Sequence, residues 1–373
     1  MSDGSQLSEM HIVIVGGGPI GLEMAVAIEH LGGKATIFEA GSVGQTMSWW
    51  APETRWFSSN ERISIAGVPL LTPDQSKATR EQYLTYLRGI VSQFELDVRT
   101  FTRVVDAKRF GNQWQVTTNR VALDERHFDL ADAGGDDFGS NLQTTNCDAV
   151  VLAIGGTDFP RKLKVEGEEL SHVDGYLREP HRYFGRRVLI VGGRNSAAEA
   201  ALRLHHAGAR VAISYRGDEL PYESIKYWIG PELRGLIQSE RIQAHMGTSV
   251  SRILPTHAVL RERAGGEIQI PADDVLLLIG YEQDKSLMEA IGVELTPDDS
   301  RRPIYDETTM QTSLPALYVA GTTVAGTQSS KYRTFLENCH IHIDRITAHL
   351  AGSEGNTAER STYRRTAELQ PES

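Results

Sequence analysis

The feature that most constrains the fold is a pattern of strand, glycine-rich turn and helix that occurs twice in the chain. In the first copy, the apolar run His11–Val15 is typical of a buried parallel strand. The turn that follows, 16–21, has G-x-G-x-x-G spacing and leads into a helical run rich in Ala, Met and Leu. This arrangement allows a sharp turn and brings a pyrophosphate close to the backbone at a helix N-terminus. The predicted contacts are Gly16, Gly18, Pro19, Ile20 and Gly21.

An acidic residue at the end of the next strand strengthens the prediction of a dinucleotide site. The apolar run 35–38 ends at Glu39, 18 residues beyond Gly21. An acid at this distance accepts hydrogen bonds from an adenosine ribose. A 2′-phosphate about 4 Å from this carboxylate would be repelled by roughly 4 kcal/mol at an effective dielectric constant near 20. The first site therefore excludes NADP and leaves FAD or NAD as its ligand.

Further candidate contacts follow strands or lie in polar loops. A Gly-rich loop, 41–46, follows Glu39, and a serine pair follows the aromatic residues Trp56 and Phe57. Apolar runs at 149–154, 275–281 and 314–322 read as buried strands with glycine at or near their ends. These stretches contribute the candidates Gln45, Thr46, Ser58, Gly155, Gly280, Gly321 and Thr322.

The second copy of the pattern differs from the first in charge. The strand 188–191 leads into the turn 192–197 and a helix at 198–206, and the next strand, 211–214, is followed by Tyr215 and Arg216. Arg216 could bind a 2′-phosphate through a charge-assisted hydrogen bond of roughly 1.5–3 kcal/mol. The alternative is that Arg216 only pairs with a surface acid such as Asp218. We interpret this site as one for NADPH, with the candidates Gly192, Gly193, Asn195, Ser196 and Arg216.

Composition limits the partners and the cellular compartment that we expect. The 373 residues carry a net charge of −11, which argues against nucleic acid or an acidic membrane as a partner. No apolar run is long enough to span a bilayer, and the N-terminus does not resemble a signal peptide. The two cysteines, Cys147 and Cys339, lie far apart, as suits a reducing cytoplasm. No cysteine or histidine cluster has zinc spacing, so we expect no metal site.

Two dinucleotide units, one marked by an acid and one by a base, resemble the two-domain flavin reductases of the thioredoxin reductase group. Within this group the chain is most similar to the bacillithiol disulfide reductases. The segments that carry this resemblance are 57–63, 191–196, 207–211, 215–217 and 225–228. The same comparison places 335–338 near the flavin or a dimer partner.

The resemblance implies an architecture and an activity. The expected fold is α/β, with two Rossmann-like dinucleotide-binding domains. Residues 1–160 and 297–351 would form a discontinuous FAD domain, and 161–296 an NADPH domain inserted in it; the composition of 352–373 predicts a disordered tail. Hydride would pass from NADPH to FAD, and electrons would pass on to a small molecule or a small redox protein. A homodimer is also implied.

Three departures from the group leave the acceptor unidentified. The chain has no Cys-x-x-Cys pair, Ile20 occupies the position of a cysteine in the bacillithiol disulfide reductases, and Thr322 replaces an aspartate that holds the flavin ribityl chain. No residue pattern identifies a catalytic acid, base or nucleophile. A ferredoxin or flavodoxin reductase, a flavin monooxygenase-like enzyme and a non-enzymatic nucleotide sensor are the alternatives.

Overall fold

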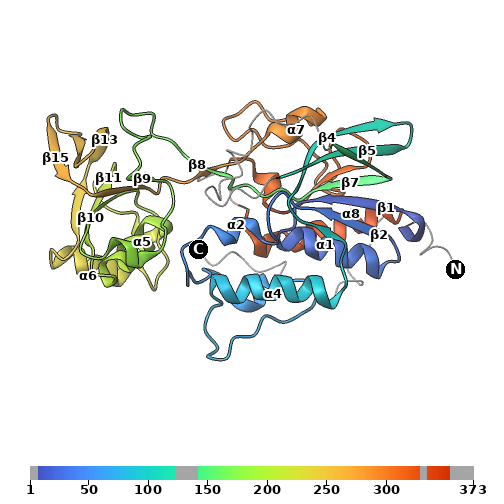
Figure 1. The fold of residues 1–373 in the computed structure, drawn as a ribbon, viewed down its shortest axis with the longest axis horizontal. Helices are drawn as coiled ribbons and strands as arrows, with labels where there is room; N and C mark the ends of the chain where they lie inside the picture. The colour runs from blue at the N-terminus through green and yellow to red at the C-terminus, as the bar shows by residue number, and fades with distance from the viewer. Residues whose placement is uncertain (1–6, 122–141, 328–333, 353–373) are drawn as a thin grey trace. The chain divides into compact units, whose positions relative to one another are not determined.

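A computed structural model describes residues 7–121, 142–327 and 334–352 (Figure 1). The chain forms two compact units. Of the described residues, the first comprises 7–48, 55–121, 142–159, 282–327 and 334–352, and the second comprises Trp49–Thr54 and Pro160–Tyr281. The expected disordered tail lies outside the described residues except for Gly352. Among the residues described, no helix has the length and hydrophobicity needed to cross a bilayer.

The first unit is built on a five-stranded parallel sheet (Figure 1). From edge to edge, its strands are β18 (Leu317–Val319), β7 (Ala149–Leu152), β1 (His11–Val15), β2 (Lys34–Phe38) and β3 (Val98–Arg99). The central strands are almost wholly apolar because both faces of the sheet are covered. Helix α1 (Pro19–His30) joins β1 to β2 and contacts α4 (Arg80–Gln93) and α8 (His340–Leu350).

A three-stranded antiparallel sheet also belongs to the first unit. Its strands are β4 (Thr102–Phe110), β5 (Gln113–Arg120) and β6 (Gln143–Cys147). The polar, glycine-rich composition of 132–145 predicts a flexible hairpin tip. Most of this stretch lies outside the described residues, but 143–145 belong to β6, so this prediction is wrong at its end. These three residues pair with β5, which supplies the ladder partners that their polar composition did not reveal.

The second unit repeats the parallel sheet. Its order is β12 (Gln243–Met246), β11 (Arg210–Tyr215), β10 (Arg187–Val191), β16 (Asp274–Leu277) and β9 (Val173–Asp174). A smaller antiparallel sheet consists of β13 (Thr248–Leu254), β14 (His257–Glu262) and β15 (Glu267–Pro271). Apolar side chains of the two sheets, among them Leu189 and Leu260, form one hydrophobic core. Helices α5 (Asn195–His206) and α6 (Gly230–Gln238) complete the unit.

The remaining elements are short. They are α2 (Gln45–Ser48), α3 (Asn60–Ile63), α7 (Ser286–Ile291), and the 3-10 helices η1 (Leu7–Glu9), η2 (Pro180–Tyr183), η3 (Tyr222–Ser224), η4 (Gly321–Ala325) and η5 (Leu336–Asn338). The chain passes between the units in β8 (Phe159–Pro160) and β17 (Tyr281–Glu282), which pair with each other.

Three element boundaries differ from the sequence prediction. Helix α5 begins at Asn195, three residues earlier than predicted, and β18 covers only the middle of the predicted strand. The sequence predicts a C-terminal helix from about Tyr332 to Leu350, but α8 begins at His340, because the separate 3-10 turn η5 precedes it. The second unit ends at Tyr281, whereas the sequence-based boundary was 296. The helix in between, α7, packs against β4 of the first unit.

Candidate active site

The first glycine-rich turn is sterically closed at both ends and open in the middle. Gly16 has φ of +112°, and a Cβ there would collide with the carbonyl oxygen of Ala153. A Cβ at Gly21 would collide with the carbonyl oxygen of Gly16, whereas one at Gly18 would meet no atom within 4 Å. Gly18 is the N-cap of α1 and makes no side-chain cap, so the first-turn N–H groups face open space. This is the shape and polarity that a pyrophosphate requires.

Glu39 is organised by the same turn. Its Oε2 accepts a hydrogen bond from Gly17 N at 2.6 Å, and its Oε1 accepts one from Gly41 N at 2.7 Å. The side chain is buried, and this burial raises the carboxyl pKa although both N–H groups act to lower it. Each carboxylate oxygen has a second lone pair. Glu39 can therefore accept hydrogen bonds from ribose hydroxyls while it stays bound to the backbone.

The strand order fixes the direction in which a dinucleotide can lie. The turn that would take the pyrophosphate follows β1, and Glu39 follows β2 on one side of it. Gly155 follows β7 and Gly321 follows β18, both on the other side. An adenosine bound at Glu39 therefore sends the second half of the dinucleotide across the ends of β7 and β18. A Cβ at Gly155 would meet nothing within 4 Å, which leaves space there.

Hydrogen bonds join the ends of β7 and β18. Gly155 N donates to Thr323 Oγ1 at 3.1 Å, and Gly321 N donates to His342 Nδ1 at 3.1 Å. The pKa of His342 is lowered to about 3 by burial, with smaller effects of nearby cations, so the ring is neutral and can accept this bond. Gln283 Nε2 donates to the carbonyl oxygens of Gly155 and Thr323. Neither His342 nor Gln283 lies in a motif, so these two residues were not among the predicted contacts.

The other predicted contacts of the first unit differ in their surroundings. Ile20 is buried, and its side chain lies where a Cβ of Gly321 would come within 3.3 Å. Gln45 Oε1 accepts hydrogen bonds from the backbone and hydroxyl of Ser42. Pro19 is the first residue of α1, and Thr46 and Thr322 are half-buried.

Ser58 belongs to a buried polar cluster that links segments far apart in the chain. Its Oγ donates to Glu337 Oε1 at 2.8 Å, and both residues are buried. Nearby, His340 Nδ1 lies 2.7 Å from Glu23 Oε2, with both side chains 3 % exposed. Burial is the largest single influence and lowers the pKa of His340, but the hydrogen bond and charge of Glu23, with smaller effects of Arg62 O and Glu337, together outweigh it and raise the pKa. No local pattern indicates this ion pair, because its members are separated by almost the whole chain.

The second glycine-rich turn has the same backbone plan with a different side chain at its centre. Gly192 has φ of +145°, and a Cβ there would collide with the carbonyl oxygen of Leu278. Gly193 is buried, and Arg194 takes the middle position and is exposed. Asn195 begins α5, and its Oδ1 accepts a hydrogen bond from Lys226 N at 2.8 Å. The exposed Ser196 is the next residue.

Arg216 directly follows β11 and is exposed. Within the part of the chain that the structure describes, its guanidinium makes no ion pair. Asp218 is bound instead by Arg263 at 2.6 Å, and Arg263 also donates to Arg216 O at 2.6 Å. The alternative interpretation, in which Arg216 only pairs with Asp218, is therefore wrong. Gly280, with φ of +105°, follows β16 and accepts a backbone hydrogen bond from Arg161.

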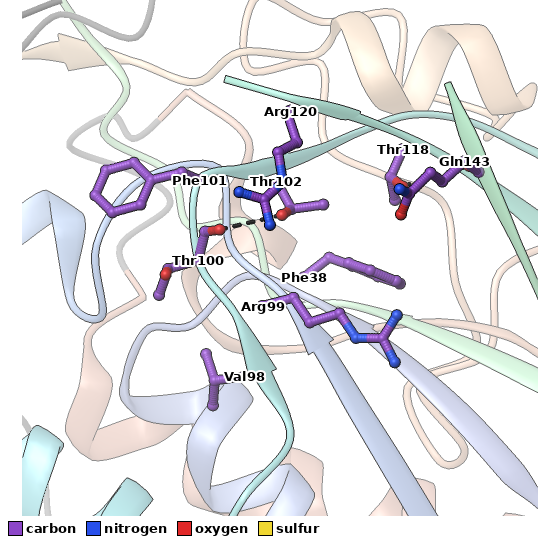
Figure 2. A pocket seen from close by; sticks show the side chains of 9 residues that line it. All are labelled: Phe38, Val98, Arg99, Thr100, Phe101, Thr102, Thr118, Arg120 and Gln143. Atoms are coloured by element: carbon purple, nitrogen blue, oxygen red, sulfur yellow. Dashed lines mark hydrogen bonds between the residues drawn. The ribbon is translucent and has the colours of Figure 1, made fainter. Parts of the chain in front are cut away.

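A pocket of about 300 Å³ lies beside the end of β2 but is separate from the glycine-rich turn (Figure 2). Phe38, Arg99 and Arg120 are among its lining residues. Successive side chains of a strand point to opposite faces. Phe38 therefore lines this pocket while the next residue, Glu39, binds the turn, so the pocket is not the predicted dinucleotide site.

The match to a protein family agrees with this geometry. Residues 13–128 and 138–321 match the family model of the pyridine nucleotide-disulphide oxidoreductases, and the chain belongs to this family. It is an NADPH-dependent flavoprotein oxidoreductase whose cofactors are FAD and NADPH. The predictions of an α/β fold of thioredoxin reductase type and of these two cofactors are confirmed.

The chain matches reductases named Bdr over most of its length. The chain is 32 % identical over 344 residues to the bacilliredoxin reductase Bdr of Bacillus subtilis (strain 168), covering 92 % of this chain and 98 % of the relative. The solved structure of the bacillithiol disulfide reductase Bdr (YpdA) from Bacillus cereus matches with a TM-score of 0.81 and 32 % identity, over 92 % of this chain and 99 % of that one. A ferredoxin–NADP reductase of Ignicoccus hospitalis is 24 % identical over 83 % of this chain and 88 % of that protein. The predicted resemblance to bacillithiol disulfide reductases is thus confirmed.

Proposed function

We propose that this chain oxidises NADPH and reduces its acceptor without using a thiol of its own. The observation that carries the proposal is the burial of both cysteines: Cys147 is 1 % exposed and Cys339 is 0 % exposed. Burial raises the pKa of the Cys147 thiol to about 12 and also raises that of Cys339. The thiolate is the form that attacks disulfides, so both thiols are inert. In the first glycine-rich turn, Ile20 occupies the position where the resemblance to bacillithiol disulfide reductases implies a cysteine.

We place FAD on the first unit and NADPH on the second. Gly18 would admit the FAD pyrophosphate, Glu39 would accept from its ribose, and the ends of β7 and β18 would hold its flavin half. The further contacts proposed for FAD are Gly16, Pro19, Ile20, Gly21, Gln45, Thr46, Ser58, Gly155, Gly321 and Thr322. Bound FAD supplies the electron-carrying chemistry between NADPH and the acceptor.

The proposed NADPH site depends on the charge of Arg216, which no acid in the described chain neutralises. Its guanidinium would bind the 2′-phosphate, and the N-terminus of α5 would face the pyrophosphate. The residues proposed to hold NADPH are Gly192, Gly193, Asn195, Ser196, Arg216 and Gly280. A cytoplasmic location, a homodimer, and no binding to nucleic acids or membranes remain parts of the proposal.

The acceptor that we propose is a low-molecular-weight disulfide. The names of the Bdr relatives support this class, and the balanced reaction is NADPH + H⁺ + RSSR → NADP⁺ + 2 RSH. A ferredoxin or flavodoxin is the second candidate, supported by the ferredoxin–NADP reductase relative. Anaerobic NADPH oxidation with bacillithiol disulfide, glutathione disulfide, ferredoxin and flavodoxin separates these acceptors. Turnover with the protein carriers alone would contradict the disulfide assignment.

The absence of a thiol step is tested by replacing both cysteines. We expect the double variant Cys147→Ala/Cys339→Ala to keep the NADPH-dependent activity of the wild type with its best acceptor. Melting curves of both proteins control for the cavities left by the removed sulfur atoms. Loss of activity in a variant that is still folded and still binds FAD would contradict the proposal.

A further inference from the structure

Arg263 lies beside the residues that follow β11, although it is 47 positions from Arg216 in the chain. It belongs to the turn between β14 and β15 of the second unit. Arg263 N donates to Gly247 O at 2.9 Å, and Gly247 N donates to Gly217 O at 2.8 Å. These backbone hydrogen bonds hold the turn of the antiparallel sheet against the loop at the end of β11.

The guanidinium of Arg263 divides its hydrogen bonds between the two residues that flank Gly217. Its Nη1 donates to Asp218 Oδ1 at 2.6 Å, and its Nη2 donates to Arg216 O at 2.6 Å. A guanidinium presents its N–H groups in a rigid planar fork, so one side chain can bind a carboxylate and a carbonyl at the same time. Arg263 therefore holds both the backbone of Arg216 and the carboxylate of Asp218.

Asp218 would oppose the binding of a 2′-phosphate if its carboxylate were released. It is two residues from Arg216, and its side chain is 83 % exposed. A released carboxylate could pair with the Arg216 guanidinium and would repel a phosphate. It could also accept from a ribose 2′-hydroxyl, as acids near the end of the second strand do in sites for NAD. Each of these effects favours NADH over NADPH.

We propose that Arg263 is a specificity-determining residue for NADPH, because it binds Asp218 and so leaves the Arg216 guanidinium to the 2′-phosphate. This inference rests on the proposed NADPH site of the second unit. It adds to that site a residue from a different sheet, outside the strand, turn and helix that define the glycine-rich pattern.

The effect of Arg263 is on local charge rather than on stability. The side chains of Arg263 and Asp218 are 60 % and 83 % exposed, and exposed ion pairs contribute little to folding. Two arginines and one aspartate leave one positive charge at the end of β11, whereas without Arg263 the charges of Arg216 and Asp218 cancel. A 2′-phosphate carries close to two negative charges at pH 7, so it responds to this difference, and NADH does not.

Isothermal titration of the FAD-loaded protein with NADP⁺ and NAD⁺ tests the inference, because the two ligands differ only in the 2′-phosphate. We expect Arg263→Gln to bind NADP⁺ roughly 3- to 10-fold more weakly at low ionic strength, the effect of one exposed charge near a phosphate. It should bind NAD⁺ no more weakly than the wild type does. The loss should shrink as salt approaches about 1 M, where exposed charges are screened.

The double variant Asp218→Asn/Arg263→Gln separates this role from a structural one. It has the local net charge of the wild type and no carboxylate that could pair with Arg216. Its NADP⁺ affinity should therefore return to within about twofold of the wild-type value. Arg210→Gln, which removes an exposed charge at the opposite end of β11, is the matched control and should leave both affinities unchanged.

Three results would overturn the role of Arg263. They are wild-type affinity of Arg263→Gln for NADP⁺, an equal loss of affinity for NADP⁺ and NAD⁺, and a double variant that binds NADP⁺ as weakly as Arg263→Gln. The last two would show that Arg263 only holds the loop through Arg216 O. Failure of the wild-type protein to prefer NADP⁺ over NAD⁺ would instead contradict the proposed NADPH site itself.

Discussion

Replacing Glu39 by glutamine tests the adenosine end of the proposed FAD site with almost no change of shape. The carboxylate accepts from Gly17 N and Gly41 N at 2.6 and 2.7 Å and keeps a free lone pair on each oxygen. In Glu39→Gln, a ribose hydroxyl that donated to a carboxylate meets a neutral amide. The difference between a charge-assisted and a neutral hydrogen bond is about 1–1.5 kcal/mol, so FAD affinity should fall roughly 5- to 13-fold.

Stability of the protein without FAD depends on different interactions. Burial raises the pKa of Glu39, so the charged form is disfavoured in the folded protein relative to the unfolded chain. A raised acid pKa means that stability is lost as the pH rises from the ordinary glutamate value through the folded value. The neutral glutamine removes this loss, but it offers one acceptor oxygen where the carboxylate offers two, so Gly17 N or Gly41 N faces an NH2 group and loses its partner. An unpaired buried N–H costs about 1–3 kcal/mol, so at pH 7 we expect the unfolding free energy of the deflavinated variant to be lower than that of the wild type.

Isothermal titration with FAD and urea unfolding of the deflavinated protein measure the two effects separately. Glu9→Gln, which changes an exposed glutamate of the same unit, is the matched control and should alter neither quantity. Equal FAD affinity of Glu39→Gln and wild type would refute the assignment of the ribose contact.

Three further predictions concern other residues. Arg216→Gln should raise the KM for NADPH about 10- to 100-fold and leave the KM for NADH unchanged in steady-state assays, because only the 2′-phosphate contact of roughly 1.5–3 kcal/mol is lost. Gly18→Ala should fold with wild-type stability but bind FAD more weakly, since its Cβ would occupy open space, whereas Gly21→Ala should be destabilised because its Cβ would collide with backbone. The lowered pKa of His342, about 3, means that stability is present above the ordinary histidine pKa of 6.5 and is lost as the pH falls below it. Urea unfolding at pH 6.5 and pH 5 should therefore show a loss of roughly 2 kcal/mol that is absent in His342→Gln.

Exposed residues of the same types serve as controls for these variants. Arg210→Gln lies at the exposed start of β11 and should leave both KM values unchanged. His30→Gln, at the exposed end of α1, should keep the wild-type pH dependence of unfolding. Equal KM values of Arg216→Gln and wild type for NADPH would contradict the phosphate contact. Weakened FAD binding in Gly21→Ala without lower stability would contradict the packing argument.

The sequence predicts those parts of the site whose residues lie close together along the chain. The spacing of glycines after an apolar strand located both turns, and the distance to Glu39 and Arg216 identified the residues at the ends of the neighbouring strands. These signals are local because strand, turn, helix and strand follow one another directly. They do not fix where a helix begins: α5 begins three residues early, and η5 separates Phe335 from α8.

The residues that the sequence did not reveal act through distant contacts. Gln283 bonds to Gly155, 128 positions away, and His340 pairs with Glu23, 317 positions away. No periodicity or spacing encodes such pairs, because their members lie far apart in the sequence and meet only in the folded chain. The fold and the two glycine-rich turns were therefore predictable, whereas the groups that join the strand ends were not.

The central claim is that electrons pass from NADPH to the acceptor without a thiol of this chain. Anaerobic titration of the purified, FAD-loaded protein with NADPH tests it most directly, with the flavin absorbance band as the signal. Two-electron uptake by FAD alone predicts that bleaching is complete at one NADPH per flavin. A requirement for a second equivalent before the band is lost would reveal another redox group in the chain and contradict the account.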